Sequence, residues 1–118
     1  MEIYSSFTFD AAHKLPNVPK GHKCGQLHGH TFNVHIYVSG KLDSSLWWVV
    51  DFGDIKKISA PIAEQLDHNY LNEIKGLENP TSENIARWIW ARLKPQLPAL
   101  TKIMVQESPR SGATYQGE

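Results

Sequence analysis

The feature that most constrains the fold of this chain is a strict alternation over residues 28–39. Side chains along a strand point to opposite faces in turn, so this pattern predicts a strand with one buried face. The two histidines of the set continue the apolar stripe to the end of that face, where water is scarce and charges are weakly screened. His35 belongs to the opposite face, where we expect solvent or a subunit contact. The core-facing set is His28, His30, Phe32, Val34, Ile36 and Val38.

His28 and His30 are suitably spaced to bind one metal ion, because residues i and i+2 of a strand share a face. The pair alone is equally compatible with two surface imidazoles. A third imidazole, His13, ends the run that begins at Phe7. Three neutral imidazoles with an open fourth position suit a catalytic zinc, whereas a structural zinc is usually closed by four protein ligands. Together with the nearby Cys24, the pattern favours a metal site.

Cys24 is the only cysteine of the chain. Alone, it could be a small buried hydrophobic residue. Its neighbours His22, Lys23 and Gly25 instead indicate an accessible, electropositive setting that favours the thiolate. One cysteine cannot form an internal disulfide, and no basic leader or membrane-spanning apolar run is present, so we expect a soluble cytoplasmic protein.

The length of 118 residues predicts a single domain over residues 1–118 that buries a core without metal or disulfide support. Twelve basic and twelve acidic residues give a formal net charge of zero. No basic block or stripe accompanies this balance, which argues against nucleic acid and anionic membranes as partners.

The remaining pattern predicts an ordered series of strands and helices. Residues 2–9 alternate as a strand, residues 14–26 form a loop rich in proline and glycine, and residues 46–51 form a short extended return. A helix follows Gly53 with Asp54 as its N-cap, and Pro61 is expected to kink or break it. The segment Asn79-Pro-Thr-Ser opens a second helix, which Pro95 closes, with its tryptophans as core residues.

Two strands are expected at the C-terminal end, on either side of a turn over residues 108–112. The first carries Ile103, Val105 and Glu107 on one face. A carboxylate at the inward end of a strand is costly unless a donor satisfies it. Glu107 therefore either forms a salt bridge with a lysine or arginine, or binds a ligand that offers paired N–H donors.

Five motifs occur in a fixed order along the chain: Phe9-x3-His13, Cys24-x3-His28-Gly-His30, Leu66-Asp67-His68-x2-Leu71, Asn79-Pro-Thr-Ser-Glu83 and a strand that ends in Glu107. With this ordered set, the chain resembles the 6-pyruvoyl-tetrahydropterin synthase superfamily over essentially its whole length. The gap of three residues between Cys24 and His28 is similar to that of the bacterial 6-carboxy-tetrahydropterin synthases of the queuosine pathway, since the tetrahydrobiopterin branch usually has a longer gap.

The resemblance implies an α+β tunnelling fold, in which an antiparallel sheet carries two helices on one face. Subunits of this family join sheet edge to sheet edge into a barrel, which would pair the exposed edges of a small sheet. A homohexamer of two stacked trimers is implied, with active sites between subunits.

The resemblance also implies a role for each motif residue. His13, His28 and His30 would bind Zn²⁺, and Cys24 would be the general base. Asp67 and His68 would form a proton relay, which requires the pair to lie at a helix end or in a turn, because sequence neighbours do not face each other within a helix. Without the other motifs, this pair would be an ordinary helix C-terminus.

The remaining motif residues would bind the pterin. Glu107 would accept from the 2-amino group and the adjacent ring N–H. Thr81 and Ser82 resemble further pterin contacts, but both are equally good helix-opening residues.

The implied activity is a zinc-dependent lyase that converts 7,8-dihydroneopterin triphosphate to 6-carboxy-5,6,7,8-tetrahydropterin, with release of acetaldehyde and triphosphate. The nearest alternative is the 6-pyruvoyl-tetrahydropterin synthase reaction on the same substrate. A zinc-dependent hydrolase is an alternative of another class, because three histidines with an open position also suit the activation of water. Against it, the sequence offers no carboxylate beside the ligands that could deprotonate the zinc-bound water. A non-catalytic zinc- or pterin-binding module would leave Cys24, Asp67 and His68 without a joint role.

Overall fold

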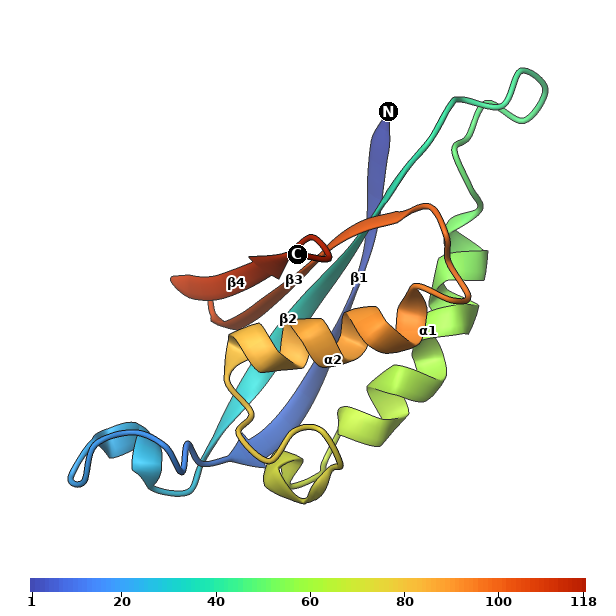
Figure 1. The fold of residues 1–118 in the computed structure, drawn as a ribbon. Coiled ribbons are helices and arrows are strands. Elements are labelled where there is room, and N and C mark those ends of the chain that lie inside the picture. The colour runs from blue at the N-terminus through green and yellow to red at the C-terminus, as the bar shows by residue number, and fades with distance from the viewer.

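The computed structural model describes all residues, 1–118, as a four-stranded antiparallel sheet with two α-helices on one face (Figure 1). The strands are β1 (Glu2–His13), β2 (His28–Ser39), β3 (Leu100–Ser108) and β4 (Ser111–Tyr115), and they lie in the order β1-β2-β3-β4. The helices are α1 (Phe52–Leu66) and α2 (Ser82–Leu93). This is the α+β architecture that the family resemblance implied.

The alternation of β2 gives the core as expected. Phe32, Val34, Ile36 and Val38 are all fully buried, and the buried apolar side chains of both helices belong to the same apolar cluster. Helix α1 packs on β1, and α2 packs on β3 and β4. The opposite face of the sheet carries no helix, and β1 and β4 form its two edges.

Strand β1 is four residues longer than predicted, and it pairs with β2 in register from Glu2↔Ser39 to His13↔His28. This extension matters for the site, because it places His13 directly opposite His28 at the end of the sheet. Two short 3₁₀ turns complete the structure near that end, η1 (Lys23–Gly25) and η2 (Leu71–Glu73). No helix combines the length and apolarity needed to cross a lipid bilayer.

The extended return expected at residues 46–51 is wrong, because no strand forms between β2 and α1. The Asp43 carboxylate accepts from the backbone N–H groups of Ser45 and Leu46, both at 2.8 Å. The backbone of Asp43 also bonds to Trp47 and Trp48, and Trp47 has a left-handed φ of 60°. These local bonds use the groups that a strand ladder would need.

The start of α1 also differs from the prediction. Asp51, and not Asp54, is the N-cap: its carboxylate accepts from the N–H of Gly53 at 2.9 Å. Asp54 instead lies in the first turn, where its charge complements the helix dipole. The helix continues through Pro61 without a break. Helix α2 matches its prediction, with Thr81 as N-cap and its last residue at Leu93.

Candidate active site

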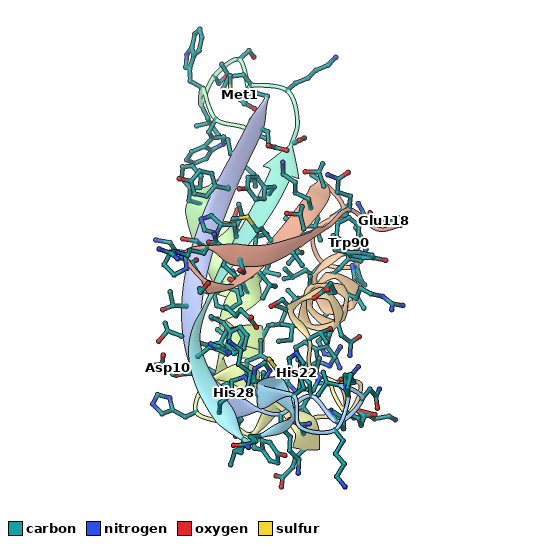
Figure 2. The ribbon with its side chains drawn as sticks, turned by 90° about the vertical axis from the view of Figure 1, so that its left-hand side faces the viewer. Met1, Asp10, His22, His28, Trp90 and Glu118 are labelled. Atoms are coloured by element: carbon teal, nitrogen blue, oxygen red, sulfur yellow. The ribbon has the colours of Figure 1, made fainter.

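Three imidazoles meet where β1 ends and β2 begins. His13 and His28 face each other across the strand pair, and His30 lies two residues further along β2 on the same face. One ring nitrogen from each of the three can be chosen so that all lie within 4.8 Å of one another. Figure 2 shows His28 at the end of the sheet opposite Met1.

Main-chain carbonyls fix the orientation of two of these rings. His13 Nδ1 donates to the Pro80 carbonyl at 2.9 Å, and His28 Nδ1 donates to the Gln26 carbonyl at 2.7 Å. A carbonyl oxygen can only accept, so each Nδ1 carries a hydrogen and each neutral ring presents its Nε2 lone pair. Such second contacts of metal-binding histidines are common, because they set the tautomer and the ring orientation.

The two Nε2 atoms are only 3.0 Å apart. Two lone pairs at this distance repel each other unless a proton or a metal ion lies between or beside them. Burial is the largest cause that lowers the pKa of His13; the bond to Pro80 opposes it, and His28 and His30 lower the pKa further. The donor set therefore fits a metal ion better than a shared proton, and three imidazoles suit zinc.

A pocket of about 330 Å³ opens beside the imidazoles. The residues that line it are Lys23, Cys24, His28, His30 and Glu107. Cys24 lies in η1 and is partly buried, so its thiol borders the pocket and is not a core residue. The structure thus brings the predicted base, two predicted metal ligands and the predicted pterin anchor to one cavity of a single chain.

Glu107 is not engaged by a lysine or arginine, which excludes the salt bridge considered as its alternative role. Its Oε2 lies 3.9 Å from His30 Nε2 and 3.5 Å from the hydroxyl of Ser82, which donates to it. The side chain is 36% exposed, and it also lines a second pocket together with Thr81 and Ser82. Its carboxylate is therefore free to accept from a ligand that enters either pocket.

Thr81 and Ser82 differ in what their side chains contact. Thr81 Oγ1 accepts from the N–H of Asn84 at 3.1 Å, which is the ordinary bond of an N-cap residue. Ser82 is buried and orients the Glu107 carboxylate. Of the two, Ser82 has the direct connection to the candidate site.

Asp67 and His68 form a close pair at the end of α1. Asp67 is the C-cap residue, and His68 follows it with a left-handed φ of 57°. This turn lets the two side chains meet, with His68 Nδ1 2.9 Å from Asp67 Oδ2, as the relay requires. The N–H of Asp10 donates to Asp67 Oδ1 at 2.9 Å and is the largest cause that lowers the pKa of Asp67, with the bond to His68 second.

The relay pair does not line the pocket that contains Cys24. It is attached to the backbone of Asp10 through bonds along the edge of β1 that β2 does not occupy. His68 lines a different hollow, which it shares with Asp10 and His30, and its side chain is 79% exposed. Within one chain, the predicted site residues therefore form two groups: Asp67 with His68, and the residues around the Cys24 pocket. His30 lines both the Cys24 pocket and the hollow beside His68.

Sequence reasoning missed several groups that shape the site. The Pro80 and Gln26 carbonyls orient His13 and His28, and the Asp10 N–H holds Asp67. These are main-chain groups, which every residue has, so no side-chain pattern could have indicated them. Lys23 was noted only as a neighbour of Cys24, and its place in the pocket was not predicted.

The fold and this site define a class of protein. The sequence matches the family described as 6-pyruvoyl tetrahydropterin synthase over residues 2–118, and the chain belongs to this family. It is similar to a solved structure of the Caenorhabditis elegans 6-pyruvoyl tetrahydropterin synthase, with a TM-score of 0.91 at 25% identity over 100% of this chain and 96% of the other.

Two curated relatives are more similar in sequence. The chain is 43% identical to a Synechocystis protein named 6-carboxy-5,6,7,8-tetrahydropterin synthase, over 96% of this chain and 91% of the relative. It is 40% identical to a Pyrococcus furiosus protein named dihydroneopterin monophosphate aldolase, over 81% of this chain and 77% of the relative. The family predicted from the ordered motifs is thus confirmed.

Proposed function

We propose that this protein is a zinc-dependent lyase that converts 7,8-dihydroneopterin triphosphate to 6-carboxy-5,6,7,8-tetrahydropterin. Acetaldehyde and triphosphate are released, and the product enters queuosine biosynthesis. The observation that carries the proposal is the single pocket that joins Cys24, His28, His30 and Glu107. The 43% identity to the Synechocystis relative supports the 6-carboxy branch.

The metal ligands in this proposal are His13, His28 and His30. The Nε2-presenting tautomers of His13 and His28, and the 3.0 Å approach of their two lone pairs, support this assignment. When bound, zinc polarises the oxygens of the substrate side chain and makes the neighbouring C–H more acidic. The low pKa of His13 keeps this ring neutral, and therefore competent as a ligand, near neutral pH.

Cys24 removes the proton of the substrate side chain. A cysteine side chain is a suitable base, because its thiolate accepts a proton readily. Lys23 lines the same pocket as Cys24. In this proposal Cys24 acts as a base and does not bind the metal, although it lines the same pocket as His28 and His30.

Glu107 holds the pterin through its 2-amino group and adjacent ring N–H. A carboxylate accepts this pair of donors in a bidentate geometry, which fixes the ring as well as binding it. Ser82 sets the orientation of the acceptor. Thr81 acts mainly as the helix cap, and it borders the second of the two pockets that Glu107 lines.

Asp67 and His68 transfer the second proton. The anionic Asp67 holds the Nδ1–H of His68, which leaves Nε2 to give or take a proton. Since the pair lies at the free edge of β1 and outside the Cys24 pocket, we propose that it serves an active site shared with a neighbouring subunit. A homohexamer with sites between subunits, as in the implied family assembly, would supply such a neighbour.

A second candidate function is aldol cleavage of a phosphorylated dihydroneopterin. The Pyrococcus relative, at 40% identity, favours it. Zinc, a base and a pterin anchor would serve this reaction too. The two reactions differ in what remains on the pterin ring: a carboxyl group in the first, and a hydroxymethyl group after aldol cleavage.

Product identification by mass spectrometry tests the proposal. Zinc-loaded protein is incubated with 7,8-dihydroneopterin triphosphate, and a Cys24→Ala preparation purified in parallel controls for contaminating enzymes. We expect 6-carboxytetrahydropterin and acetaldehyde from the wild type alone. A 6-pyruvoyl product, a 6-hydroxymethyl product or unconverted substrate would each contradict the proposal.

A further inference from the structure

The loop between β1 and β2 carries an unbalanced positive charge. The whole chain is neutral, yet residues 11–42 contain no aspartate or glutamate. Within this run, four cationic or potentially cationic side chains fall between the predicted ligands His13 and His28. They are Lys14, Lys20, His22 and Lys23. We call these four residues the basic loop set.

The basic loop set has no acidic partner. All four side chains are exposed, and none of them takes part in the three ion pairs of the structure. Lysines that serve only solubility commonly alternate with acids on a mixed surface. A group of unpaired cations beside a catalytic pocket instead attracts an anionic ligand.

The backbone holds the loop in a defined shape. The N–H of Leu15 donates to the carbonyl of Cys24 at 2.8 Å, which joins the two arms of the loop. Asn72 binds both the N–H and the carbonyl of Lys14, at 3.0 and 2.8 Å. Lys14 and Lys23 therefore project from fixed points on neighbouring arms.

His22 contributes a hydrogen-bond donor of known identity. Its Nδ1 accepts from the N–H of Cys24 at 3.0 Å, so Nδ1 cannot carry a hydrogen. The hydrogen of the neutral ring is therefore on Nε2. That N–H is available to an anionic oxygen, because no other group of the chain accepts from it.

These side chains line two pockets. Lys14, Lys20 and His22 line a pocket of about 320 Å³, and Lys23 lines the pocket that contains Cys24. The turn η1 borders both, because its Gly25 lines the first pocket and its Lys23 and Cys24 line the second. The histidine cluster connects them to Glu107: His30 approaches Glu107, and His28 binds Gln26 of the loop. Glu107, the imidazoles and the basic loop set therefore follow one another in space, in that order.

We infer that the basic loop set binds the phosphate chain of the substrate. This inference rests on the proposed function, which fixes the pterin at Glu107 and the side-chain oxygens at the imidazoles. The phosphate chain, at the far end of the same molecule, then reaches the loop. Lysines act here as point charges that neutralise phosphate oxygens, and the His22 Nε2–H donates to one of them.

The inference makes this loop a determinant of substrate choice. A triphosphate carries more negative charge than a monophosphate, so several lysines favour it more strongly. The same contacts neutralise the triphosphate as it leaves. Substrates without phosphate lose these contacts but keep the pterin and metal contacts.

The test compares two ligands by calorimetry. The ligands are 7,8-dihydroneopterin triphosphate and unphosphorylated 7,8-dihydroneopterin, titrated into zinc-loaded protein that also carries Cys24→Ala to prevent turnover. The test variant replaces Lys14, Lys20 and Lys23 with Gln. The matched control replaces three exposed lysines elsewhere, Lys41, Lys57 and Lys75, with Gln and thus makes the same change in net charge.

We expect the test variant to bind the triphosphate about tenfold to a hundredfold more weakly, since three exposed charge contacts each contribute a few-fold. Its affinity for dihydroneopterin should be unchanged. Raised salt should narrow the difference in triphosphate affinity between the wild type and the variant. The corresponding triple Lys→Arg variant should retain triphosphate binding. Unchanged zinc content and thermal unfolding would show that the variants are folded.

Two results would overturn the inference: equal losses for both ligands, or equal losses in the test and control variants. The titration does not depend on which product forms. A 6-hydroxymethyl or 6-pyruvoyl product with lysine-dependent triphosphate binding would refute the proposed function alone. A 6-carboxy product with lysine-independent binding would refute the inference alone.

Discussion

Replacing Glu107 by Ala should weaken pterin binding without removing the metal. The carboxylate offers two oxygens to the paired N–H donors of a pterin, and each charge-assisted hydrogen bond is worth about 1.5–3 kcal/mol. Two such bonds give about 3–6 kcal/mol. The Glu107 side chain is 36% exposed, so water can replace part of what is lost, and the lower end of this range applies.

A loss of about 3 kcal/mol corresponds to a Kd raised by roughly a hundredfold. The assay is fluorescence titration of 7,8-dihydroneopterin into the wild type and the Glu107→Ala variant. Glu64→Ala, which removes a carboxylate from an exposed position of α1, is the control for the change in charge and should bind as the wild type does.

Metal analysis of the same preparations completes the experiment. Glu107 approaches His30 only to 3.9 Å, so its removal should leave zinc stoichiometric. An unchanged Kd would refute the anchor assignment. Loss of zinc together with loss of binding would instead make Glu107 a metal ligand and refute the division of roles in the pocket.

Three further predictions concern the proton-transfer groups. Cys24→Ala should lower turnover by a factor on the order of a hundred to ten thousand while zinc content and pterin affinity stay normal, since a positioned base contributes about that much; turnover near the wild-type rate would remove Cys24 from the mechanism. Cys24→Ala and His68→Ala chains should each be inactive alone but regain part of the activity after unfolding and refolding together, because mixed oligomers contain intact sites if Cys24 and His68 come from different subunits; failure to regain activity, with mixed oligomers present by native mass spectrometry, would place the whole site within one chain. The lowered pKa of Asp67 means that its ionised form stabilises the fold above its unfolded pKa of about 3.8, and that this stability is lost as pH falls through the lower folded value. The free energy of unfolding of Asp67→Asn, measured by chemical denaturation, should therefore be lower than that of the wild type near neutral pH and approach it below pH 3.8. A difference in free energy between the two proteins that does not change with pH would contradict the pairing of Asp67 with Asp10 and His68.

Much of the fold could be predicted because alternation and helix caps are local signals. The stripe from His28 to Val38 identified the central strand and its buried face, and Thr81 with Pro95 bounded α2 closely. The segment before α1 could not be predicted in the same way. Large and β-branched residues at 46–51 favour a strand, but the Asp43 carboxylate and the Asp43–Trp48 backbone bonds close a turn there instead.

The candidate site was predictable in its residues more than in its arrangement. The spacing of His28 and His30 places them on one face of a strand, and His13 was predicted as the third imidazole. The register of β1 with β2, which places His13 opposite His28, became visible only in the structure. The separation of Asp67 and His68 from Cys24 had no sequence signal, because it depends on where α1 ends relative to the edge of β1. Main-chain acceptors such as the Pro80 carbonyl could not be predicted either, because their position depends on the folded backbone and not on the side-chain pattern.

The central claim is that three imidazoles hold zinc while the thiol beside them remains free. X-ray absorption at the zinc edge tests this directly, because Zn–N and Zn–S distances differ, at about 2.0–2.1 and 2.3 Å. We expect one zinc per chain with nitrogen and oxygen ligands only, and a His13→Ala preparation with little zinc. A sulfur at about 2.3 Å would make Cys24 a ligand, and stoichiometric zinc in His13→Ala would remove His13 from the site; either result would contradict the account.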